Sequence, residues 1–137
     1  MDAQFYLAFM YFHGEGVQAD KSQALELYTQ AAAQGHTMSQ YNLGYMYYHG
    51  EGVGVDKTRA VELITKAADQ GYAAALNYLG FMYFRGDGVE VDEDRAEKLF
   101  AQAADQGLVL SRHNMLTRTL KSKMDWILTL PVRFSGK

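Results

Sequence analysis

The chain has 137 residues, a net charge of −3, no cysteine, and an apolar content of 48%. This length fits one ordinary domain or about four short repeats, and the apolar content is enough for a continuous core. The net negative charge and the scattered Lys and Arg argue against a dedicated nucleic-acid-binding protein, which usually carries a basic patch. The lack of cysteine excludes disulfides and thiolate metal sites.

No targeting or membrane segment is visible in the sequence. Residues 1–12 lack the basic start of a signal peptide, and no apolar run reaches the ~18–20 residues of a membrane span. We therefore expect a soluble protein without a transmembrane segment. The compartment stays open: cytoplasmic or, for a processed fragment, periplasmic or secreted.

Three stretches of the chain repeat one another at a fixed spacing. The phrase Gly-Glu-Gly-Val or Gly-Asp-Gly-Val begins at Gly14, Gly50 and Gly86, and an aspartate, an Ala-Ala pair and a closing glycine follow each time. A period between 20 and 50 residues is typical of repeat architectures. We predict three units, at residues 1–35, 36–71 and 72–107, followed by a different segment at 108–137.

The middle unit reads as two helices joined by a glycine turn. Apolar side chains recur at helical spacing over residues 38–49 and again over 57–70. Gly50 ends the first helix, because glycine adopts left-handed dihedral angles easily. Asp56 is expected to cap the start of the second helix, and Gly71 to follow its end. The sequence therefore predicts an all-α chain of helix–turn–helix units.

Small residues recur where the helices are expected to meet. Ala8, Gly44 and Gly80 share one position of the first helix, and a glycine there costs about 1 kcal/mol relative to alanine. We infer that helix axes approach closely at this position. Leu7, Met10 and Tyr11, with their counterparts in the other units, are assigned to the core.

These residues resemble a known family. The run Leu-Gly-Tyr-Met-Tyr-Tyr-His-Gly-Glu-Gly-Val from Leu43, followed by Asp56, is similar to the Sel1-like repeat, a relative of the tetratricopeptide repeat with a longer, glycine-bearing turn. The runs from Leu79 and from Leu7 match in the same register, with Ala8 at the usual glycine. The three units cover residues 1–107.

The resemblance implies an α/α solenoid, a right-handed superhelix, that acts as a non-catalytic scaffold or adaptor for a protein or peptide. Members of the family take part in bacterial host interaction, signalling, envelope processes and endoplasmic-reticulum quality control. Cysteine-rich members hold each repeat with a disulfide. This chain has no cysteine, so the penicillin-binding or β-lactamase activity attached to some of those relatives is not carried over.

In the related tetratricopeptide fold the first helix of each unit lines the concave face. The resemblance therefore implies a partner-binding surface made of Phe5, Phe9, Phe12, His13, Tyr41, Tyr45, Tyr48, His49, Asn77, Phe81, Phe84 and Arg85. We predict two aromatic ladders that stack across the units: Phe9 with Tyr45 and Phe81, and Phe12 with Tyr48 and Phe84. The alternative, that these rings pack in the core, stays open at this point.

No catalytic, metal or cofactor site is expected. His13 and His49 share a repeat position, so they lie about 10 Å apart by helix-packing distances, too far to bind one metal. Glu15, Glu51 and Asp87 in the glycine turns are expected to be solvated charges, because calcium needs several converging oxygens. The glycine turns lack the dinucleotide-binding fingerprint. We therefore expect a protein that is not an enzyme.

Residues 108–137 lose the repeat pattern. We expect a partial fourth repeat that continues as a capping helix up to Pro131, since terminal repeats of solenoids are atypical. Alternatively, this segment or the uncapped first unit joins two copies in a homo-oligomer, or its basic and apolar residues contact a membrane surface. Two other functions remain: a self-assembling structural unit, and an accessory protein with a cell-envelope ligand.

Overall fold

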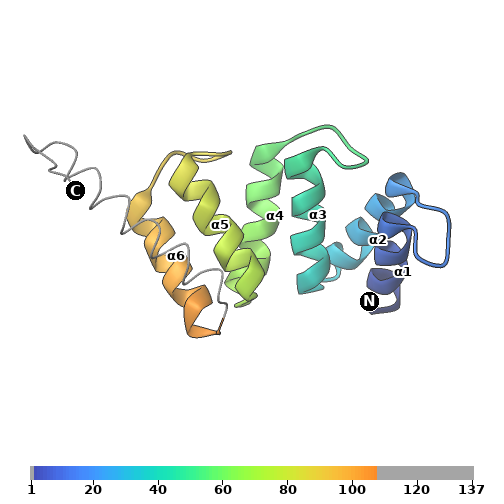
Figure 1. The fold of residues 1–137 in the computed structure, drawn as a ribbon, viewed down its shortest axis with the longest axis horizontal. Coiled ribbons are helices and arrows are strands. Elements are labelled where there is room, and N and C mark those ends of the chain that lie inside the picture. The colour runs from blue at the N-terminus through green and yellow to red at the C-terminus, as the bar shows by residue number, and fades with distance from the viewer. Residues whose placement is uncertain (1, 108–137) are drawn as a thin grey trace, which may run out of the picture.

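The computed structural model describes residues 2–107, and within that range the chain forms six α-helices and no strand. Their bounds are α1 Asp2–His13, α2 Lys21–Ala33, α3 Thr37–His49, α4 Lys57–Asp69, α5 Ala73–Arg85 and α6 Glu93–Asp105. Extensive packing joins only helices that are consecutive in the chain. The helices stack in chain order from one end of the molecule to the other (Figure 1). The predicted all-α solenoid is confirmed.

Two predictions from the sequence depend on which residues the structure describes. The partial fourth repeat and the capping helix predicted for residues 108–137 fall outside the described range. Between residues 2 and 107, no helix is both long and apolar enough to cross a membrane.

Local signals set the helix ends as expected. The carboxylates of Asp20, Asp56 and Asp92 each accept a hydrogen bond from the backbone N–H three residues later, at 3.0–3.1 Å. Gly50 and Gly86 follow the first helices with φ of +72° and +76°, in the left-handed region that favours glycine. An aspartate therefore sets the start of each second helix, and a glycine sets the end of the first helix in the second and third units.

The predicted close approach of the two helices is confirmed. A Cβ atom at Gly44 would lie 2.6 Å from Cγ1 of Ile64, and one at Gly80 would lie 2.6 Å from Cε1 of Phe100. Real Cβ atoms do not come this near to a neighbour, so α3 and α4, like α5 and α6, are packed against a glycine backbone. Ala8 is fully buried at the same position of α1.

The core runs along the length of the solenoid. Whether a side chain is buried in this core depends on the position of its unit in the stack. Leu43 and Leu79 are each 2% exposed, whereas Leu7 at the same repeat position is 39% exposed. The assignment of Leu7 to the core is therefore wrong. Leu43 lies in one cluster with Ala24 and Tyr28 of α2, and no described helix stands before α1 to cover Leu7 in this way.

The glycine turn of the third unit rests on the start of α4. A Cβ atom at Gly88 would lie 2.7 Å from the backbone oxygen of Lys57. The Lys57 ammonium lies 3.7 Å from an Asp87 carboxylate oxygen and 5.0 Å from the ring centroid of Tyr48. The Tyr48 hydroxyl donates a 2.6 Å hydrogen bond to Asp87. This bond, more than any other contact, lowers the pKa of the Asp87 carboxyl.

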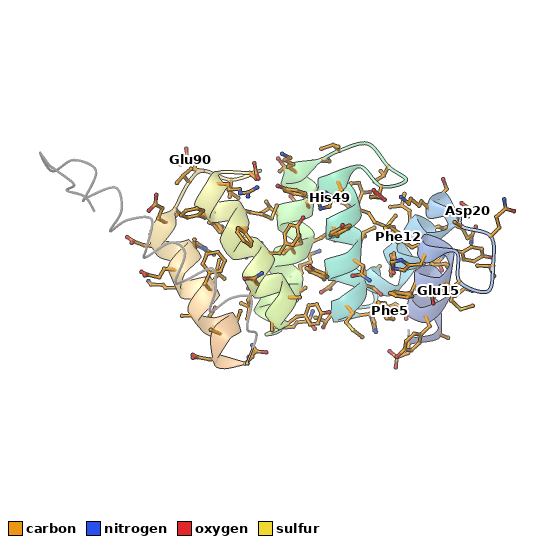
Figure 2. All side chains as sticks on the ribbon, in the orientation of Figure 1. Phe5, Phe12, Glu15, Asp20, His49 and Glu90 are labelled. Atoms are coloured by element: carbon orange, nitrogen blue, oxygen red, sulfur yellow. The ribbon has the colours of Figure 1, made fainter. Side chains whose placement is uncertain are left out.

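The same contact recurs one unit earlier with one group missing. Lys21 forms an ion pair with Glu51 and lies 5.2 Å from the ring centroid of Phe12, which has no hydroxyl to donate. The expectation that these turn carboxylates are merely solvated is wrong for the second and third turns, where they join each turn to the preceding unit. Glu15 in the first turn is exposed (Figure 2).

We expect Gly44→Ala to lower the free energy of unfolding, although alanine is the better helix former by about 1 kcal/mol. The new methyl would meet Ile64, and overpacking a core usually costs about 1–3 kcal/mol. We therefore expect a net loss of about 1 kcal/mol in urea unfolding. Gly54→Ala is the control, because nothing lies within 4 Å of a Cβ there. Equal stability of the two variants would contradict the close approach.

We expect Asp87→Asn to lower the free energy of unfolding by about 1 kcal/mol at pH 7, since a charge-assisted hydrogen bond and a partly exposed ion pair are weakened. In the fold the pKa of this carboxyl lies below its ordinary value of 3.8. Its contribution is therefore present above pH 3.8 and is lost as the pH falls through the lowered pKa. Urea unfolding from neutral to strongly acidic pH should show the two proteins converging.

The matched control for this variant is Glu51→Gln in the second turn. Because Phe12 offers no hydroxyl, this substitution removes only the ion pair with Lys21, and its loss of stability should be smaller. Equal losses at the two positions would show that the Tyr48 hydroxyl contributes nothing.

Candidate functional site

The residues predicted to bind a partner lie on α1, α3 and α5, and we call their common surface the first-helix face. Phe9 and Tyr45 are the most exposed of its aromatic side chains, at 37% each. The remaining exposed members are polar: His13, His49 and Arg85. Those that are partly buried are Phe12, Tyr41, Tyr48, Phe81 and Phe84. In Figure 2, Phe5 and Phe12 lie on the side of α1 toward α3.

Two members of the predicted set are not on an open surface. Phe5 is 8% exposed and Asn77 is 6% exposed. The Phe5 ring packs against Tyr28, with ring centroids 5.9 Å apart, and against His36 at 5.1 Å. Both side chains are buried, so the expectation that all twelve residues line one exposed surface is wrong for them.

The predicted aromatic ladders are also wrong. In the part of the chain that the structure describes, no ring contact joins Phe9 to Tyr45 or Tyr45 to Phe81. The same is true of the second ladder, in which Phe12 does not contact Tyr48 and Tyr48 does not contact Phe84. The rings pair along each helix instead: Phe9 with His13 at 4.1 Å and Tyr45 with His49 at 4.2 Å. Residues four apart on one helix are near neighbours, whereas successive helices are separated by about 8–10 Å.

The contact across the second and third units is made by a residue outside the predicted set. Tyr78 of α5 packs its ring near Tyr41, Tyr45 and Tyr48, with centroids 6.0, 6.2 and 5.4 Å away. Its hydroxyl oxygen lies 2.8 Å from Nε2 of His49. Burial, and then the neighbouring tyrosines, raise the pKa of Tyr78, so the phenol stays protonated. Tyr78 therefore fills the space between α3 and α5.

The corresponding position between the first and second units is occupied by Asn42, and a hollow remains there. The Asn42 side-chain amide donates a 3.2 Å hydrogen bond to the Tyr28 hydroxyl. The hollow measures about 230 Å³ between α1 and α3. Its lining residues are Phe9, Phe12, His13, Tyr28, Tyr41, Asn42, Tyr45 and Met46. We call it the aromatic hollow. The difference between Asn42 and Tyr78 at one repeat position was the sequence signal for it.

A larger hollow of about 650 Å³ lies between α4 and α6. Its walls carry charges of both signs, and several of them already act in the fold. Asp92 caps α6, and the Arg95 guanidinium lies 4.8 Å from the ring centroid of Tyr83. Rigid aromatic side chains carry more interface energy than solvated, mixed charges. The aromatic hollow is therefore the stronger candidate site.

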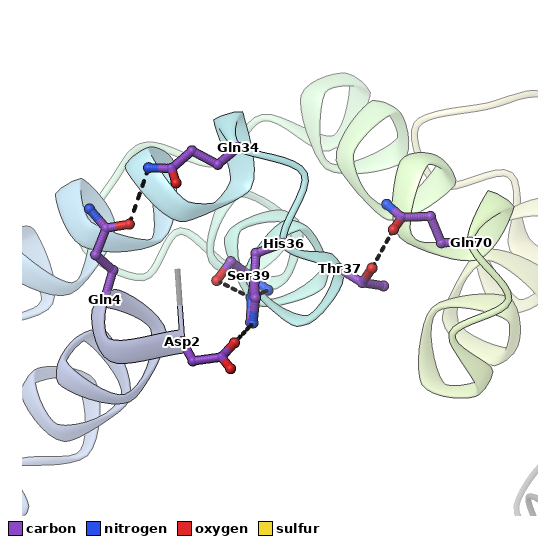
Figure 3. A network of polar contacts seen from close by, with 7 residues as sticks. All are labelled: Asp2, Gln4, Gln34, His36, Thr37, Ser39 and Gln70. Atoms are coloured by element: carbon purple, nitrogen blue, oxygen red, sulfur yellow. Dashed lines mark hydrogen bonds and ion pairs between the residues drawn. The ribbon is translucent and has the colours of Figure 1, made fainter.

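The polar residues at the junction of the first two units serve the fold. Nδ1 of His36 accepts a 3.2 Å hydrogen bond from the Ser39 backbone N–H and so caps α3. Its Nε2 lies 3.0 Å from an Asp2 carboxylate oxygen (Figure 3). Gln34 donates to Gln4 at 3.3 Å in the same region. From residue 2 to residue 107 no group of three or more His, Asp or Glu side chains could hold a metal ion.

Comparison with known proteins identifies the repeat. The family model of the Sel1 repeat matches residues 2–36, 37–72 and 73–108. A protective antigen of uropathogenic Escherichia coli with an SLR fold is 42% identical, with a TM-score of 0.79 over 80% of this chain and 24% of its own. A Sel1 repeat protein from Oxalobacter formigenes is 30% identical, with a TM-score of 0.80 over 83% of this chain and 47% of its own.

This chain therefore spans about a quarter and about half of the length of these two relatives. Helicobacter pylori cysteine-rich protein B shares the fold, with 21% identity and a TM-score of 0.68 over 82% of this chain and 91% of its own. No functionally curated protein matches the chain. With three matched repeats lying on three pairs of helices, the chain belongs to the Sel1 repeat family.

Proposed function

We propose that this chain is a non-catalytic scaffold whose first-helix face, the surface predicted to be concave, binds a peptide segment of a partner protein. Sel1 repeat proteins are generally protein-interaction scaffolds. The observation that carries the proposal is the aromatic hollow between α1 and α3. Phe9 and Tyr45 stand at this hollow with 37% of each side chain exposed.

The chemistry of this face suits peptide binding. Buried aromatic anchors supply much of the energy of protein interfaces, and a polar rim surrounds them. Here the exposed His13, His49 and Arg85 stand beside the aromatic side chains and supply such a rim. Because these residues lie on helices, their backbone is already ordered before a partner binds, which lowers the entropic cost of binding.

The shifted pKa values in the described range have structural causes. Burial, more than the neighbouring tyrosines, raises the pKa of Tyr41 to about 12, and the lowered pKa of Asp87 follows from the hydrogen bond donated by Tyr48. Neither shift places a proton donor or acceptor near the pH range in which acid–base catalysts work. Both shifts therefore follow from contacts that belong to the packing of the fold.

A second candidate function is end-to-end assembly, favoured by one observation. Tyr6 is 61% exposed and Leu7 is 39% exposed on the side of α1 that has no described helix beside it. A second copy could cover this apolar surface. Light scattering at rising concentration tests the idea: a mass that grows for the wild type, but not for Tyr6→Ser/Leu7→Ser, would support it, and a constant monomer mass would exclude it.

The peptide-binding proposal is tested by selecting a random linear-peptide library against the immobilised protein. We expect the enriched peptides to bind the Phe9→Ala/Tyr45→Ala variant about tenfold or more weakly, which is the loss typical of interface hot spots. Binding is measured by fluorescence anisotropy, and circular dichroism checks that the variant is still folded.

The matched control is Val55→Ala/Val91→Ala, which removes exposed apolar side chains from the turns and leaves the first-helix face intact. It should bind the peptides as the wild type does. If no peptide is enriched, or if the two double variants bind alike, this face is not a peptide-binding surface.

A further inference from the structure

We propose that the aromatic hollow is a subsite for a tyrosine side chain of the bound segment, an inference that rests on the proposed function. The reason lies in the repeat itself. At the next junction along the solenoid, the protein fills the corresponding place with its own tyrosine, Tyr78. The surroundings of Tyr78 therefore show which side chain such a place accepts.

Tyr78 is held by three aromatic neighbours and one hydrogen bond. Its ring packs near Tyr45 and Tyr48, with centroids 6.2 and 5.4 Å away, and Tyr41 lies on a third side at 6.0 Å. The hydroxyl oxygen lies 2.8 Å from Nε2 of His49. An aromatic body with a polar tip satisfies both parts of this environment.

The aromatic hollow offers the same groups one unit earlier. Phe9, Phe12 and His13 occupy the repeat positions of Tyr45, Tyr48 and His49, and all three line the hollow. The pair of ring and imidazole has the same geometry at both junctions. Phe9 and His13 are 4.1 Å apart with an interplanar angle of 47°, and Tyr45 and His49 are 4.2 Å apart at 47°.

The difference between the junctions is the side chain that fills them. Asn42 takes the place of Tyr78, and its side-chain amide donates a hydrogen bond to the hydroxyl of Tyr28, which also lines the hollow. His13 makes ring contacts with Phe9 and Phe12 but no hydrogen bond to any residue between 2 and 107. The first junction thus keeps two of the three ring neighbours and the imidazole, and it lacks the phenol. Phe5, the counterpart of the third neighbour Tyr41, packs against Tyr28 and His36 instead.

Size and polarity agree with a single phenolic side chain. The hollow of about 230 Å³ is smaller than the roughly 300–1,000 Å³ of sites that hold a whole small molecule. Besides its phenylalanine and tyrosine side chains, the lining contains the His13 imidazole, the Asn42 amide and the Met46 thioether. A phenylalanine would fill the space but leave the imidazole without a partner, and an aliphatic side chain would also lose the ring contacts.

The first experiment titrates the whole chain with acetyl-Gly-Gly-Tyr-Gly-Gly-amide, and with the matched Phe and Leu peptides, by ¹H–¹⁵N NMR. We expect the tyrosine peptide to shift amide signals of α1 and α3 around Phe9, His13 and Asn42. Its affinity should exceed that of the phenylalanine peptide by about fivefold, because a hydrogen bond is gained. Shifts elsewhere only, or equal affinities for the tyrosine and phenylalanine peptides, would overturn the proposal.

Variants built from the repeat complete the test. Tyr28→Ile/Asn42→Tyr copies the filled junction, where Ile64 and Tyr78 stand, and should abolish the shifts. His13→Phe keeps an aromatic wall on an exposed position, so it should fold and should make the tyrosine and phenylalanine peptides bind equally. A double variant that folds, shown by circular dichroism, and still binds the tyrosine peptide would refute the subsite, as would unchanged selectivity of His13→Phe.

The failure of this inference is distinguishable from that of the proposed function. Library peptides that depend on Phe9 and Tyr45 but contain no common tyrosine would leave the binding face standing and remove the tyrosine subsite. If no peptide depends on Phe9 and Tyr45, both proposals are wrong.

Discussion

The close approach of the two helices in each unit is the constraint on which the rest of the structure depends. At Gly44 and Gly80 there is no room for a Cβ atom beside the second helix, so α3 with α4, and α5 with α6, are each held at a short distance. The turn then binds the start of the preceding second helix, as Asp87 binds Lys57. Together these contacts fix how one unit is placed on the next, and hence which side chain of a unit faces its predecessor.

Once that placement is fixed, a single position decides whether a junction is filled or hollow. Asn42 and Tyr78 occupy this position at the two junctions. The neighbouring residues of the second helices differ in size in the opposite direction. The larger Tyr28 lies below the small Asn42, and the smaller Ile64 belongs to the junction of the larger Tyr78. Exchanging volume in this way changes the surface, while the small residue of the first helix stays small in both units, as Ala8 and Gly44. Variation between units at such positions therefore points to function, whereas agreement between units points to the fold.

The sequence predicts what is local and repeated, and it fails where a residue depends on its place in the stack. The helices, the aspartate caps and the contact at Gly44 follow from signals within one unit. Leu7 was misplaced because its counterpart Leu43 is covered by the unit before it. The aromatic ladders were wrong because aligned positions were assumed to touch. The contacts between units join different positions instead, such as Tyr45 with Tyr78 and Tyr48 with Asp87, and a comparison of aligned repeats does not reveal these.

The three described units offer little area, so the affinity for the proposed peptide has to come from a few anchors rather than from extent. Exposed aromatic side chains are suitable anchors only if they are held in place. Phe9 and Tyr45 are each held by a histidine one helical turn away, at 4.1 and 4.2 Å, and the Arg85 guanidinium lies 5.7 Å from the Phe81 ring centroid in the third unit. A polar partner limits how much of each ring is open to unspecific apolar contact and adds a hydrogen-bonding group beside it. If the proposed function holds, this pairing favours bound segments that carry both an aromatic ring and a polar tip over segments that are merely apolar.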